Sequence, residues 1–222
     1  MPQDYWQMIP DGVKPGWSLT TEYDGDLLRR AKLGNPHFGV LYYGKSPSGN
    51  YDQWWFQEVG GGGSVILPYT VDPSGRTFIG LVLQRRPLQD EVNLVWGFPR
   101  GFKPREMTHD EAAAMEYREE TGDFSAVEVV RLEGDGGNPN NAFFDSREGG
   151  MQFYTVKLPW EAFIPNPQGE GIVFRTNELT AEQKLELIQG CVFIEDDFRR
   201  ISRLGDMISH SCYLRWLAYR QV

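Results

Sequence analysis

Several short segments of the chain are rich in apolar, aromatic and β-branched residues, and Gly, Pro and Asn separate these segments. Such segments between turn residues predict β-strands. The sequence DPSG lies between two of the segments and predicts a tight turn that joins them. The predicted strands cover residues 38–44, 51–59, 64–71, 76–84, 125–132 and 151–158.

The central helix is predicted by its ends as well as by its composition. Thr108 is followed three residues later by Glu111, a capping-box arrangement in which each side chain satisfies a backbone N–H group of the other residue. The residues that follow, DEAAAMEYREE, are mostly strong helix formers. Gly122 can adopt the left-handed conformation that ends a helix, so we expect the helix to end there.

Two further helices are predicted in the C-terminal part of the sequence. Thr180 and Gln183 repeat the capping-box spacing, so one helix is expected to begin at Thr180 and to end at Gly190. Another is expected around residues 206–220. The predicted strands and helices do not alternate regularly, which indicates a mixed α/β fold.

The first part of the chain differs in character from the rest. Residues 1–36 are rich in Pro, Gly and aromatic residues and predict an irregular segment with one short helical candidate at 26–32. The first two predicted strands form an aromatic β-hairpin, and a run of four glycines follows it. We therefore expect an N-terminal extension over residues 1–59 and a second domain over residues 60–222.

Composition and charge exclude several classes of protein. The chain has 222 residues, 40% of them hydrophobic, and no apolar run reaches the ~18 residues of a spanning helix, so a soluble protein without a membrane partner is expected. The N-terminal sequence lacks a signal-peptide pattern, and Cys191 and Cys212 form no disulfide framework, so we expect a cytoplasmic location. The net charge of -9 argues against a nucleic-acid partner.

Three glutamates on the central helix are the strongest candidates for chemistry. Glu116, Glu119 and Glu120 are three and four residues apart, so their carboxylates point to one face within a single turn. Like charges at this spacing repel, and a bound cation reverses the penalty. Mg²⁺ and Mn²⁺ prefer such oxygen ligands. A solvated acidic helix face is the alternative explanation.

The glutamates lie in a segment that resembles a known motif. GFKPREMTHDEAAAMEYREETGD resembles the Nudix box, whose pattern is Gly, five residues, Glu, seven residues and then Arg-Glu-aliphatic-x-Glu-Glu-x-Gly-aliphatic. The strand, hairpin and Arg-Pro segment before it is similar to that of the ADP-ribose and nucleotide-sugar pyrophosphatase group of this family. The residues that match the box in register are Gly101, Glu116, Glu119, Glu120 and Gly122.

The resemblance implies an α/β/α sandwich around a mixed sheet, with the N-terminal hairpin as an extension. It also implies a hydrolase that cleaves the pyrophosphate bond of a small-molecule nucleoside diphosphate linked to another moiety, such as ADP-ribose, with Mg²⁺ or Mn²⁺ as cofactor. The metal ligands would be Glu116, Glu119, Glu120 and a backbone group of Gly101. Glu119 and Glu120 would take part in catalysis, and Glu170 would supply a general base, with Glu148 or a box glutamate as alternatives.

The same resemblance implies substrate-binding residues and an assembly. Arg85, Arg86 and Arg100 are the expected substrate-binding arginines, since arginine binds phosphate in bidentate fashion. A surface or interface position is the alternative for Arg85 and Arg86. Trp96 is expected to contact the substrate, with a place in the core as its alternative. The aromatic hairpin is similar to the N-terminal strands with which members of the group form homodimers, so a homodimer is a further expectation.

Departures from the box pattern support a second hypothesis about the function. Met107 replaces the first Glu of the pattern, Met115 replaces the Arg, and Asp123 replaces the last aliphatic residue, while Tyr117 stands at the other aliphatic position. The pattern's Arg is expected to orient the glutamates. The alternative to an active hydrolase is therefore a catalytically impaired Nudix-fold module that binds nucleotides or regulates another protein.

Overall fold

Contacts within the chain separate two units, residues 1–62 with 137–150 and residues 63–136 with 151–222. The predicted division into an extension over 1–59 and a domain over 60–222 stays a prediction. The computed structural model describes residues 18–24, 28–35, 39–45, 52–58, 62–85, 94–123, 128–132, 150–176, 178–185, 187–204 and 207–221.

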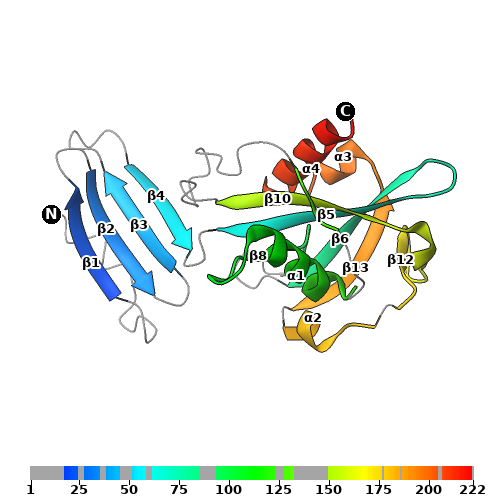
Figure 1. Ribbon diagram of the computed structural model, residues 1–222, viewed down its shortest axis with the longest axis horizontal. Coiled ribbons are helices and arrows are strands. Elements are labelled where there is room, and N and C mark those ends of the chain that lie inside the picture. The colour runs from blue at the N-terminus through cyan, green and yellow to red at the C-terminus, as the bar shows by residue number, and fades with distance from the viewer. Residues whose placement is uncertain are drawn as a thin grey trace. The chain divides into compact units, whose positions relative to one another are not determined.

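In the described part of the first unit, four antiparallel strands form a sheet in the order β1-β2-β3-β4 (Figure 1). The predicted aromatic hairpin is confirmed as β3–β4, in whose register Trp55 lies opposite Tyr42. The helix predicted at 26–32 is wrong, because the chain from Leu28 pairs with β1 on one side and with β3 on the other. Pairing with two neighbours outweighs a weak local preference for helix. The strands are β1 (Ser18–Asp24), β2 (Leu28–Asn35), β3 (Gly39–Lys45) and β4 (Asp52–Glu58).

The described residues of the second unit form a mixed sheet of nine strands. Its main path has the order β11-β12-β13-β6-β5-β10-β9, while β7 pairs with β6 and β8 pairs with β5. Strands β5 and β10 run parallel, and the other pairs of this sheet run antiparallel. The strands are β5 (Gly63–Val71), β6 (Thr77–Arg85), β7 (Leu94–Gly97), β8 (Arg100–Phe102), β9 (Val130–Arg131), β10 (Met151–Leu158), β11 (Phe163–Pro165), β12 (Ile172–Phe174) and β13 (Ile188–Glu195).

Helices cover both faces of this sheet. Ile66 of β5 belongs to the same buried cluster as Tyr117 of α1, whereas Tyr69 of β5 packs edge-on against Trp216 of α4 with 5.4 Å between ring centroids. Side chains alternate between faces along a strand, so positions 66 and 69 place the two helices on opposite faces (Figure 1). The predicted α/β/α sandwich around a mixed sheet is confirmed. The helices are α1 (His109–Thr121), η2 (Trp160–Ala162), α2 (Ala181–Leu185), α3 (Phe198–Ile201) and α4 (Met207–Tyr219).

The ends of α1 follow the sequence prediction. The Thr108 side chain accepts from the N–H group of Glu111, and the Glu111 carboxylate accepts from the N–H group of Thr108 at 2.8 Å. At the other end, Gly122 is left-handed with φ of 73°. Both ends of α1 are therefore fixed by local contacts.

The helix predicted to run from Thr180 to Gly190 is wrong at its C-terminal end. Its capping bonds are present, since the N–H group of Thr180 donates to Gln183 Oε1 at 2.8 Å and the N–H group of Gln183 donates to Thr180 Oγ1 at 3.1 Å. However, α2 ends at Leu185, and Gly190 lies inside β13, where it pairs with Leu83 of β6. Pairing with a central strand of the sheet decides the conformation here. Among the described residues, no helix is both long and apolar enough to cross a membrane.

The predicted turn after β5 is tied together by one carboxylate. Asp72 Oδ1 accepts from the N–H group of Ser74 at 2.9 Å, from its hydroxyl at 2.7 Å and from the N–H group of Arg76 at 2.9 Å. Asp72 Oδ2 accepts from Arg76 Nε at 2.9 Å. These bonds, first of all the one from the Ser74 side chain, lower the pKa of Asp72 to about 2 although burial opposes the shift.

This turn predicts a pH-dependent stability. The folded pKa of Asp72 lies below its ordinary value of 3.8, so its stabilising effect is complete above about pH 4 and is lost as the pH falls to about 2. In chemical denaturation, Asp72→Asn is expected to lower the free energy of unfolding at pH 6 and to have little effect near pH 2. Glu178→Gln removes an exposed carboxylate and is the matched control. An equal effect of Asp72→Asn at both pH values would contradict this assignment.

Candidate active site

The segment before α1 is held between the helix and the central strand of the sheet. In the pairing of β8 with β5, Arg100 lies opposite Val65 and Gly101 lies opposite Ser64. The N–H group of Ile66 donates to the carbonyl of Pro99 at 2.9 Å, which extends the contact by one residue. The backbone of residues 99–101 therefore has a fixed position, and α1 packs beside it.

Gly101 is in direct contact with the first of the three glutamates. A Cβ atom built on Gly101 would overlap the carboxylate carbon and both oxygens of Glu116. Only glycine leaves room for this close approach of a side chain to the backbone. The match of both residues to the predicted pattern thus has a steric reason, because the glycine makes the cradle in which the carboxylate of Glu116 lies.

Glu120 is held from two sides. Its side chain is 3% exposed, and its Oε2 atom accepts from the backbone N–H group of Arg100 at 3.0 Å. Its carbonyl oxygen accepts from Gln183 Nε2 of α2, also at 3.0 Å. The sequence indicated Gln183 only as a helix cap. In the structure the same side chain caps α2 and fixes the last turn of α1, a role that no local sequence signal could reveal.

Two carboxylates therefore face one short stretch of backbone. Glu116 and Glu120 are four residues apart on α1 and both contact residues 100–101, while Glu119 is half-buried in the same turn. Within the described part of the chain, no three His, Cys, Asp or Glu side chains come close enough together to hold a metal ion by themselves. Mg²⁺ commonly takes only one or two carboxylates, with water and substrate oxygens completing its shell, so the pair and its glycine cradle suit such an ion.

Two of the departures from the box pattern meet in the structure. The hydroxyl of Tyr117 donates to Asp123 Oδ2 at 2.6 Å across the C-terminal end of α1. The Tyr117 side chain is fully buried, and burial together with this bond raises its pKa. Where the pattern has two aliphatic residues, this chain has one hydrogen-bonded pair. This contact was not predicted from the sequence.

A buried thiol lies behind the glutamates. Cys191 of β13 is buried, and its burial, together with the negative charges of Glu120 and Asp123, raises the pKa of the thiol. The thiol therefore stays protonated at neutral pH. The Cys191 side chain therefore acts as a small apolar group packed near the last turn of α1, and not as a nucleophile.

The predicted substrate-binding residues are distributed over the neighbouring strands. Arg85 is exposed at the end of β6, where its N–H group donates to the carbonyl of Leu187. Trp96 is half-buried in β7, opposite Leu83. Arg100 is half-buried next to Gly101. Arg86 lies outside the described residues.

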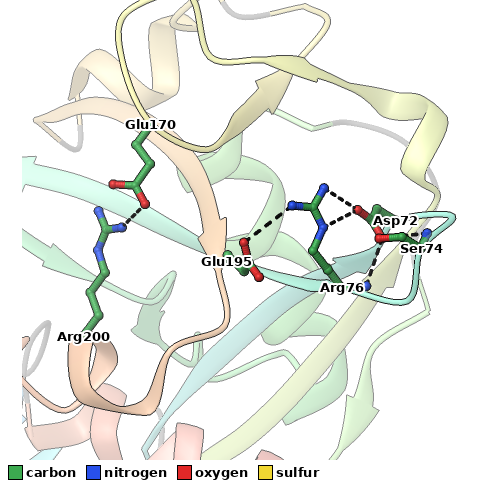
Figure 2. Close-up of polar contacts among 6 residues, drawn as sticks. All are labelled: Asp72, Ser74, Arg76, Glu170, Glu195 and Arg200. Atoms are coloured by element: carbon green, nitrogen blue, oxygen red, sulfur yellow. Dashed lines mark hydrogen bonds and ion pairs between the residues drawn. The ribbon is translucent and has the colours of Figure 1, made fainter.

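The structure does not bring Glu170 to the three box glutamates. Glu170 lies in the turn between β11 and β12, and its carboxylate accepts from Arg200 Nη1 at 2.7 Å (Figure 2). The cleft that it lines also includes Arg76, which follows the far end of β5. That end lies six residues, or roughly 20 Å, along the strand from the part that pairs with Arg100. The alternative base Glu148 lies outside the described residues.

Comparison with known proteins assigns the chain to a family. The NUDIX domain matches residues 63–190, and none of the curated proteins matches. The C-terminal domain of mouse MUTYH, solved with human PCNA, is 12% identical and covers 72% of this chain and 88% of its own length, with a TM-score of 0.43.

Two hydrolases are also similar in structure. An ADP compounds hydrolase is 11% identical, with coverage of 94% of this chain and 95% of its own and a TM-score of 0.45. The Nudix hydrolase RenU from M. smegmatis is 14% identical, with coverage of 81% and 93% and a TM-score of 0.41.

The family match supports a hydrolase of nucleoside diphosphate derivatives, and hydrolases of this family generally use divalent metals. It covers more than half of the 222 residues and includes every residue from Gly101 to Gly122, so the chain belongs to the Nudix family.

Proposed function

We propose that this protein hydrolyses the pyrophosphate bond of a nucleoside diphosphate linked to a sugar, such as ADP-ribose. The main support is the placement of Glu116 and Glu120 against the backbone of residues 100–101 within a Nudix domain. The sugar-linked substrate class is supported by the resemblance of the strand and Arg-Pro segment before the box to the nucleotide-sugar pyrophosphatase group.

The divalent ion of the proposed reaction is Mg²⁺ or Mn²⁺. Glu116 and Glu120 would hold it together with a backbone group of Gly101. A bound ion of this kind stabilises the charge of a diphosphate and lowers the pKa of a water molecule. The backbone N–H group of Arg100 keeps one oxygen of Glu120 in place, so the pair needs little rearrangement on binding.

We assign to Glu119 the acceptance of a proton from the attacking water. Glu119 lies on the same turn of α1 as Glu116 and Glu120, the proposed metal ligands, and it is half-buried there. Glu170, in contrast, pairs with Arg200 at the other end of the sheet. Arg85, Arg86, Arg100 and Trp96 remain the proposed contacts to the diphosphate and nucleoside.

A catalytically impaired nucleotide-binding module is the second candidate. Met107 and Met115 favour it, because they remove the Glu and the Arg of the box pattern. Under this alternative the protein is stabilised by nucleoside diphosphate derivatives but releases no product from them. Turnover therefore separates the two candidates directly.

Carboxylate removal tests the proposed site. Glu116→Gln and Glu120→Gln keep the shape of each side chain but remove its charge, and each is expected to lower kcat/KM on the order of 100-fold or more. Phosphate release, after coupling to a phosphatase, is measured on ADP-ribose, other nucleotide sugars, dinucleoside polyphosphates and nucleoside triphosphates. Glu178→Gln is the control. EDTA should abolish turnover and excess Mg²⁺ should restore it, and turnover that survives both variants would rule out this site.

The cradle at Gly101 gives a second prediction. In Gly101→Ala the added methyl group displaces the carboxylate of Glu116, so we expect kcat/KM to fall roughly 100-fold, the cost of a misplacement near 1 Å. Gly190→Ala is the matched control, because a Cβ atom there meets nothing within 4 Å. Equal activity in the two variants, at equal thermal midpoints, would show that the contact is unimportant.

The identity of the base gives a third prediction. General-base catalysis contributes roughly 100-fold or more, so Glu119→Gln is expected to lose at least that factor in kcat. Glu170→Gln is expected to change kcat by less than about 3-fold, because its carboxylate pairs with Arg200 at the other end of the sheet. The reverse order of effects would restore Glu170 as the base and would require a large movement of its loop.

A further inference from the structure

A cleft separate from the box glutamates opens beside the β11–β12 hairpin. Its volume is about 710 Å³, within the range of roughly 300–1,000 Å³ that is usual for small-molecule sites. It lies at the end of the sheet where β5 turns into β6, away from residues 100–101. The residues that define its character are Arg76, Trp160, Phe163, Glu170, Arg175 and Glu195.

The wall of the cleft is preformed. Phe163 of β11 stacks on Phe174 of β12 at 4.9 Å between centroids and packs edge-on against Phe193 of β13 at 4.5 Å. Gly171 has φ of 90°, and a Cβ atom there would overlap the carbonyl of Phe193, so the turn that bears Glu170 lies tightly on β13. The hairpin is therefore fixed to the sheet by aromatic packing and by a close backbone approach.

Trp160 gives the cleft a planar apolar surface. It is half-buried in the η2 turn and packs against Phe78 of the core, with 5.5 Å between ring centroids. The Trp160 ring is thus fixed against the core while both rings line the cleft. An aromatic ring fixed in this way can stack with a planar ligand, and such stacking contributes roughly 1–3 kcal/mol per nucleobase.

Most charged groups at the cleft are already neutralised by one another. Arg76 pairs with Asp72 at 2.8 Å and with Glu195 at 3.8 Å, and Glu170 pairs with Arg200 (Figure 2). These pairs leave one lining cation to be accounted for, Arg175.

The guanidinium group of Arg175 is held at Nε, and its terminal nitrogens Nη1 and Nη2 are the groups that could bind a ligand in the cleft. Its Nε atom donates to the carbonyl of Glu161 at 2.6 Å, and its backbone N–H group donates to the carbonyl of Ala162. Over the described residues, its two terminal nitrogens take part in no hydrogen bond or ion pair. A guanidinium whose plane is fixed in this way can bind a phosphate group with both terminal nitrogens.

The carboxylates that line the cleft add a second requirement. The ion pairs of Glu170 and Glu195 use one oxygen of each carboxylate, Oε1 of Glu170 and Oε2 of Glu195. A carboxylate has room for more than one donor, so a ligand with hydroxyl groups can also donate to these side chains. The ligand that matches the cleft therefore combines a planar ring, hydroxyl groups and one phosphate.

We infer that this cleft is a second ligand site that binds a nucleoside monophosphate, with the base on Trp160 and the phosphate on Arg175. The ribose hydroxyl groups lie toward the carboxylates of Glu195 and Glu170. This site is independent of the proposed hydrolysis, because none of its lining residues belongs to the box.

Photolabelling tests the inference without any need for turnover. The full chain is irradiated with 8-azidoadenosine monophosphate, which has no pyrophosphate bond to cleave, and the labelled peptides are mapped. We expect label within residues 159–176, and we expect adenosine monophosphate to displace it. Adenosine or inorganic phosphate should need at least a 10-fold higher concentration for the same displacement. Label confined to peptides from residues 94–123, or no displaceable label, would overturn the inference.

Two arginine variants complete the test. Arg175→Ala is expected to reduce the displaceable label at residues 159–176 at least 10-fold, whereas Arg131→Ala removes an exposed arginine from the opposite edge of the sheet and should leave it unchanged. Arg175→Lys keeps the positive charge but loses the two terminal nitrogens. We expect this variant to be labelled weakly and to have an unchanged thermal midpoint. Full labelling of both Arg175 variants would overturn the assignment of the phosphate.

Discussion

The close contact between the backbone at Arg100–Gly101 and the carboxylates of α1 is the constraint on which the rest of the site depends. Carboxylates four residues apart on a helix repel each other, and burial of Glu120 adds to the cost. A backbone N–H group and a glycine without a side chain offset this cost at one place. The pairing of β8 with β5 and the caps of α1 serve to bring these two elements into contact.

Local signals in the sequence predicted local structure well. They failed where contacts with distant segments of the chain determine the backbone conformation. The capping box at Thr108 and Glu111 and the left-handed Gly122 located α1 because every contact involved lies within a few residues. The prediction that Gly190 ends a helix is wrong because the conformation of Gly190 is set by pairing with β6, more than 100 residues earlier in the chain. The box resemblance placed Glu116, Glu120 and Gly101 together, whereas the spacing of Glu170 could not show which end of the sheet its loop occupies.

The contact between Tyr117 and Asp123 changes how the divergence of the box is understood. Two unusual residues, each unfavourable alone in an apolar position, satisfy each other across the end of the helix. Thr121 joins them, since its hydroxyl donates to the carbonyl of Tyr117 and accepts from the N–H group of Asp123. The last turn of α1 is therefore held by a polar network, and Gln183 ties the same turn to α2. Because hydrogen bonds are directional, such a network fixes the orientation of the turn that carries Glu120, in addition to the packing of its side chains.

The parallel pairing of β5 with β10 has a consequence for synthesis on the ribosome. In this pairing, residue 63 lies opposite residue 151. The thiol of Cys212 in α4 contacts the carbonyls of Val65 and Tyr154. Both β10 and α4 are therefore synthesised long after β5. Contacts of such long sequence separation form slowly and late. The acidic helix can thus form early as an isolated segment, while the strand that supports Gly101 waits for the last helix of the domain. Between these two moments the nascent chain exposes an apolar strand with an open edge, which is the stage at which chaperones would be needed most.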